Sequence, residues 1–90
     1  MGTLDKLERK ARRNPGGVRI GELVHLAESA GFAVTRTTAG HYVLVHPGLR
    51  ATVGVAEPHG GGDSFLKVSY VRKVLSAIDD LRAGEAAAEE

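Results

Sequence analysis

The sequence predicts one α+β domain, a two-layer sandwich in which a three-stranded antiparallel sheet carries helices on one face, with a basic helix added at the N-terminus. Three observations support this. The chain has 90 residues, enough for one hydrophobic core. Two segments repeat apolar residues at the spacing of an amphipathic helix. Between them lie three short runs rich in β-branched residues and separated by turn-forming residues.

Residues 1–14 are predicted to form a basic helix and the turn that ends it. Five of the ten residues in 4–13 are lysine or arginine, and only three are apolar. The NPGG run from Asn14 to Gly17 stops the helix because proline and glycine do not continue one. Since its apolar stripe is thin, we expect this helix to dock loosely.

Residues 15–83 are predicted to form the main domain, followed by an acidic flexible tail at 84–90. The helix that opens the domain has apolar residues at i, i+3, i+4 and i+7, namely Ile20, Leu23, Val24 and Ala27. Gly31 ends it, because glycine adopts the left-handed conformation without steric cost. The same spacing predicts a closing helix over 68–82 that ends at Gly84.

Three strands are predicted between these helices, over 32–37, 41–46 and 51–55. The turns at 39–40 and 47–48 are short, which favours antiparallel hairpins and therefore a meander. Alternation along the second strand separates two sets of side chains, His41, Val43 and Val45 on one face and Tyr42, Leu44 and His46 on the other. Both sets contain apolar residues, so the pattern does not decide which face the helices cover.

The charge of the chain is unevenly distributed. The net charge is +1, yet residues 6–73 contain eleven basic and five acidic side chains, and residues 79–90 contain one basic and five acidic. A basic body suits a polyanionic partner such as RNA. The layout of helices on one sheet face also matches double-stranded-RNA-binding modules, although a shared fold does not by itself assign a function.

Several other functions are excluded by composition and motif. The chain has no cysteine, so disulfides and thiolate sites are ruled out. It has no apolar run long enough for a membrane span and no apolar stretch of a signal peptide near its start, so we expect a cytoplasmic protein without membrane contact. The glycines at 60–62 are not followed by the Lys-Ser or Lys-Thr of a phosphate-binding loop.

The histidines are the remaining candidates for chemistry. Alternation places His41 and His46 on opposite strand faces, and the four histidines of the chain are dispersed, so we expect no metal or other cofactor. His41 opens a strand after a glycine, where a side chain is accessible and rigidly held, as a general acid or base requires. A plain surface histidine remains the alternative interpretation of this position.

A resemblance to a known family favours the catalytic interpretation. The run from 36 to 48, RTTAGHYVLVHPG, resembles the central motif of HicA-type toxins, small ribonucleases of bacterial type II toxin–antitoxin systems. In that family Gly-Ser-His opens the second strand and His-Pro often closes it. Here Ala39-Gly40-His41 takes the first place and His46-Pro47 the second. Similar segments before and after extend the resemblance over about residues 4–82.

The resemblance implies a metal-free ribonuclease that cleaves mRNA with one catalytic histidine, which corresponds to His41, and that is silenced by a HicB-type antitoxin protein. An imidazole can take the proton of the RNA 2′-hydroxyl, while cations stabilise the phosphate. The cations predicted to contact RNA are Arg36, Lys67, Arg72 and Lys73. The further RNA-binding candidates are His46 and His59, either of which could serve as a second proton-transfer group.

Two other classes of function stay open. The first is a non-catalytic RNA-binding module, or a degenerate toxin, with the same fold, because the Ala-Gly-His departure touches the motif itself. The second is a structural or protein-docking domain. His41 separates these alternatives, since only an enzyme requires its imidazole.

Overall fold

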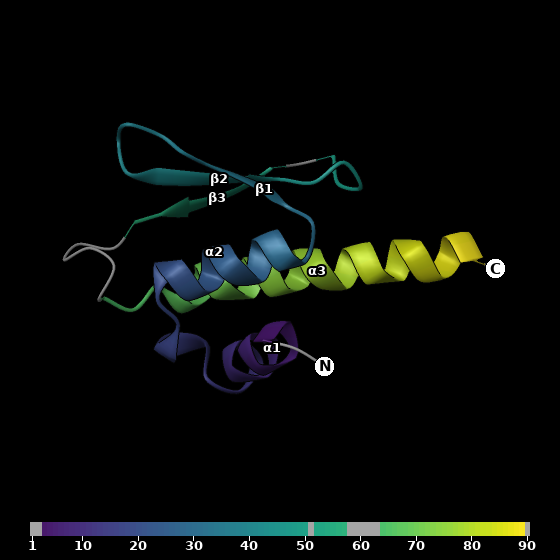
Figure 1. Cartoon of the computed structure of the whole chain (residues 1–90), viewed down its shortest axis with the longest axis horizontal. Helices are drawn as coiled ribbons and strands as arrows, with labels where there is room; N and C mark the ends of the chain where they lie inside the picture. The colour runs from purple at the N-terminus through teal and green to yellow at the C-terminus, as the bar shows by residue number, and fades with distance from the viewer. Residues whose placement is uncertain (1–2, 51, 58–63, 90) are drawn as a thin grey trace.

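The computed structural model describes residues 3–50, 52–57 and 64–89 and places the elements in layers (Figure 1). The sheet forms one layer, α2 and α3 lie beneath it, and α1 lies below these helices. The elements in chain order are α1 (Thr3–Arg13), the 3-10 turn η1 (Pro15–Gly17), α2 (Ile20–Ser29), β1 (Ala33–Arg36), β2 (His41–Val45), β3 (Val53–Ala56) and α3 (Val68–Glu89).

The predicted α+β class and the antiparallel meander are confirmed. The strand order is β1-β2-β3, and both pairings are antiparallel. The strands are slightly shorter than predicted at 32–37 and 41–46, and the third is shifted to Val53–Ala56. Phe32 lies outside β1, and its amide donates a hydrogen bond to the Ala27 carbonyl of α2 at 3.0 Å.

Burial decides which face of the sheet is covered. Leu44 of β2 and Val55 of β3 are each only 1% exposed and pack with apolar residues of α2 and α3. Tyr42 shares their face, which we call the covered face. His41, Val43 and Val45 therefore lie on the opposite face, and Val45 remains 44% exposed.

Ion pairs attach α1 to the helical layer. Ala11 joins the buried core, but three charged contacts flank it. Arg12 binds Asp79 at 2.7 Å, Arg82 binds Glu8 at 2.6 Å, and Lys10 binds Glu22. The thin apolar stripe that predicted loose docking is thus supplemented by charge contacts to both α2 and α3.

Gly84 does not end α3, so that prediction is wrong. The helix continues to Glu89 and extends beyond the sheet (Figure 1). One glycine costs a helix only about 1 kcal/mol relative to alanine, and the alanines and glutamates that follow favour helix. Within the described ranges, none of the helices combines the length and the apolar character that crossing a lipid bilayer requires.

We predict that Glu8→Gln destabilises the fold in a pH-dependent way. Hydrogen bonds from Arg82, and more weakly from Arg12, lower the pKa of Glu8 from 4.5 to about 2 against the opposing effect of burial. Ionised Glu8 therefore stabilises the folded state fully above pH 4.5, and this contribution disappears as the pH falls towards 2.

Urea unfolding measures the effect. At pH 7 we expect Glu8→Gln to lower the free energy of unfolding by about 1–2 kcal/mol, a figure that allows for solvent screening of the exposed arginines. The difference from the parent protein should shrink below pH 4.5. Glu28→Gln is the control, since Glu28 forms no ion pair among the described residues. An equal loss at pH 7 and pH 2.5 would contradict the proposed role.

Candidate functional site

His41 combines a fixed backbone with a free side chain. Its carbonyl oxygen accepts a hydrogen bond from the Thr37 amide at 2.8 Å, and its own amide donates to Thr37 Oγ1 at 3.2 Å. The carbonyl of Gly40, which has φ of +81°, accepts from the Glu57 amide at 3.0 Å. The side chain is exposed, and no hydrogen bond to its imidazole occurs among the described residues. The backbone of His41 is therefore held at a defined place, and its imidazole is open to a ligand.

Small and apolar side chains surround His41 on this surface. We call it the open face, and its residues are Ala33, Thr35, His41, Val43, Val45, Gly54 and Ala56. Ala56 lies directly opposite His41 across the β2–β3 pairing, and Gly54 has open space where a side chain would stand. A large ligand can therefore approach the imidazole closely.

Arg36 does not lie beside His41. It is paired with Tyr42 in the register and so belongs to the covered face. Its Nη2 atom binds Glu57 Oε2 at 2.8 Å, and its guanidinium carbon lies 5.9 Å from the centre of the Tyr42 ring. The sequence predicts Arg36 as a cation that contacts RNA near the histidine, and it does not identify Glu57 as the partner of Arg36. Side chains alternate along a strand, so Glu57 lies on the same face as Val55. This alternation is the signal that could have indicated the ion pair with Arg36.

Lys67, Arg72 and Lys73 are exposed and form no ion pair among the described residues. Lys67 precedes α3, and the other two lie near its first turns. The amino end of α3 lies at the same end of the molecule as the β1–β2 turn, but α3 belongs to the layer under the covered face (Figure 1). No hydrogen bond or ring contact joins His41 to these cations within the described ranges.

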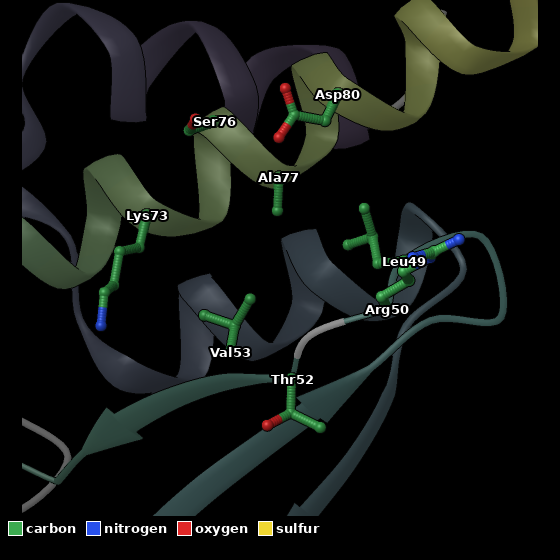
Figure 2. Close-up of a pocket in the computed structure, with 8 residues that line it drawn as sticks. All are labelled: Leu49, Arg50, Thr52, Val53, Lys73, Ser76, Ala77 and Asp80. Atoms are coloured by element: carbon green, nitrogen blue, oxygen red, sulfur yellow. The ribbon is translucent and has the colours of Figure 1, made fainter.

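Lys73 faces a groove between α3 and the edge strand β3. The groove encloses about 380 Å³, and Lys73 points from α3 toward the sheet while Arg50 lies at the opposite end (Figure 2). Apolar side chains of Val53 and Ala77 lie between them. Arg72 is the neighbouring residue on the helix and points about 100° away from Lys73. The two predicted cations therefore point in different directions from α3.

The side chain of His46 makes structural contacts with neighbouring residues. It is half-buried, its ring meets the edge of Phe32 at a centroid distance of 5.3 Å, and its Nδ1 accepts a hydrogen bond from the Gly48 amide at 2.9 Å. These contacts tie the β2–β3 turn to the segment between α2 and β1. His59, the other candidate for proton transfer, lies outside the described residues.

No group of three or more histidine, aspartate and glutamate side chains gathers as metal ligands in the part of the chain that the structure describes. Comparison of the chain with models of protein families, with curated proteins and with solved structures finds no match.

We predict that His46→Ala and His41→Ala differ in stability. His46→Ala removes an aromatic contact and a hydrogen bond and should lower the free energy of unfolding by about 1–2 kcal/mol. His41→Ala removes an exposed side chain and should change it by no more than about 0.5 kcal/mol. Urea denaturation followed by circular dichroism measures both, with the exposed His25→Ala as control. A larger loss for His41→Ala than for His46→Ala would contradict these placements.

Proposed function

We propose that this protein is a cytoplasmic, metal-independent endoribonuclease that cleaves mRNA with His41 as general base, and that it is the toxin of a HicA-type toxin–antitoxin system. One observation carries the proposal. The imidazole of His41 is free and exposed, while its backbone is held by hydrogen bonds on both sides of the strand end. The resemblance of the surrounding run to the toxin motif supports the same residue.

The chemistry requires few protein groups because RNA carries its own nucleophile. His41 takes the proton of a 2′-hydroxyl, the resulting oxygen attacks the adjacent phosphorus, and the bond from phosphorus to the 5′-oxygen breaks. The leaving 5′-oxygen takes a proton from water or from a second acid. A general base of this kind contributes about 10²–10⁴-fold to the rate.

The layout of the domain supports an RNA-binding role. Two helices cover one face of a three-stranded antiparallel sheet, and we propose that the fold is of the double-stranded-RNA-binding type. Of the predicted cations, Arg36 is neutralised by Glu57, which leaves Lys67, Arg72 and Lys73 for phosphates.

A protein partner completes the proposal. A free ribonuclease would damage its own cell, so we propose an antitoxin of the HicB type that covers His41. The unpaired cations near the start of α3 favour an acidic surface on that partner, which would compete with RNA and speed association.

A non-catalytic RNA-binding module is the second candidate. The placement of Arg36 on the covered face favours it, because the predicted cation on the neighbouring strand is then not available beside His41. RNA binding that persists without cleavage would identify this alternative.

We predict that His41→Ala abolishes cleavage of RNA and growth arrest on expression. His41 carries the only imidazole among the open-face residues named above, so its loss removes the general base. Gel analysis of RNA incubated with the purified protein measures cleavage, and excess EDTA should leave the parent activity unchanged.

His25→Ala is the matched control, because His25 is an exposed histidine on α2 and should retain full activity. Unchanged cleavage by folded His41→Ala would remove His41 from the mechanism. Activity that is lost in EDTA and restored by a divalent cation would contradict metal independence.

We predict that RNA affinity falls with salt and that Arg72 and Lys73 account for part of this dependence. The double change Arg72→Ala and Lys73→Ala should reduce the magnitude of the log–log salt slope by about one to two, because each phosphate contact releases close to one counterion. Fluorescence anisotropy of a labelled RNA, titrated at several KCl concentrations, gives the slope. Arg13→Ala on α1 is the control, and a flat slope for the parent protein would rule out a phosphate-contacting surface.

A further inference from the structure

We infer that Arg36 and Glu57 form a strap across the covered face, over Tyr42, that positions His41 from behind the sheet. Arg36 is then a positioning residue and makes no contact with RNA. The effect on cleavage rests on the proposed function, whereas the effect on the strand end does not.

The ion pair joins two strands that are not neighbours. β1 and β3 both pair with β2, and neighbouring strands lie about 4.8 Å apart, so the outer strands are separated by about 10 Å. Arg36 at the end of β1 and Glu57 just after β3 bridge this distance through their long side chains, with 2.8 Å between Nη2 and Oε2. The guanidinium passes near the ring of Tyr42, which lies on β2 between them.

The strap ends where the backbone of His41 is held. Arg36 precedes Thr37, whose amide and hydroxyl both hydrogen-bond to the backbone of His41. Glu57 itself donates its amide to the carbonyl of Gly40. Tyr42 follows His41 in β2 and faces the strap, so the imidazole points the other way. Both flanks of the histidine are therefore tied to one ion pair.

The strap acts locally. The side chains of Arg36 and Glu57 are 59% and 23% exposed, and exposed pairs contribute little to global stability. The ends of short strands, however, open more readily than the core, and a contact between the two outer strands opposes this fraying. Loss of the pair should therefore move the imidazole while leaving the overall fold intact.

Charge reversal tests the strap against direct RNA contact. Arg36→Glu and Glu57→Arg should each lower kcat for RNA cleavage by about 10- to 100-fold with KM unchanged, because misplacement of a catalytic group affects the chemical step. The double variant recreates the pair with exchanged partners and should recover most of kcat. Arg13→Glu on α1 is the control for charge change and should match the parent protein.

A direct phosphate contact by Arg36 gives a different result. In that case Arg36→Glu raises KM, reduces the salt slope of RNA binding, and is not rescued by Glu57→Arg. This outcome would overturn the strap as the role of Arg36.

Hydrogen exchange tests the strap without any cleavage assay. The amides of Thr37 and His41 should exchange faster in each single variant and return towards the parent rate in the double variant. Unchanged exchange in both single variants overturns the inference. If the parent protein does not cleave RNA in a His41-dependent way, the proposed function fails, and the exchange rates still decide whether the strap exists.

Discussion

The burial of Leu44 sets the orientation of every other side chain in β2. Leu44 is 1% exposed beneath the sheet, and side chains alternate along a strand, so Tyr42 faces the helices and His41 faces away. A register slip of one residue would expose Leu44 and bury the imidazole, which has no polar partner in the core. The accessibility of His41 is therefore a consequence of core packing, and the strand needs no separate device to keep the histidine outside.

The helical layer also decides how the charges of the chain are used. The apolar residues of α2 and α3 form one core beneath the sheet, and α1 joins it through Ala11 and Leu7 and adds ion pairs to both helices. Arg12 and Arg82 are neutralised in that attachment, and Arg36 is neutralised by Glu57. A count of basic residues therefore overstates the surface offered to a polyanion. The cations without an ion pair among the described residues include Lys67, Arg72 and Lys73 near the start of α3, and these three describe the proposed RNA-contacting surface better than the net charge does.

The helices and strands follow from periodicity, because apolar spacing reports burial within one element. The identity of the covered face could not be predicted from the sequence, because Val43 and Leu44 are both apolar. Only packing against the helices distinguishes these two residues. The ion pair of Arg36 could not be predicted either, because Glu57 lies 21 residues away in the sequence. The contact between the two side chains depends on the registers of two strand pairings. The predicted helix end at Gly84 is wrong for a local reason. The helix propensity of the alanines and glutamates after Gly84 outweighs the unfavourable propensity of this one glycine.

His41 lies outside the buried core of the domain. His41 contributes nothing to the buried core, so a chain could lose or keep this histidine without a measurable change in folding. The ion pair between Arg36 and Glu57 differs, because it joins the strand that precedes the histidine to the strand that lies beside it. A sheet of three short strands has few other means of holding its end rigid, since each outer strand is paired on one side only within the described sheet. The proposed positioning of His41 in so small a domain therefore depends on contacts made on the opposite face of the sheet.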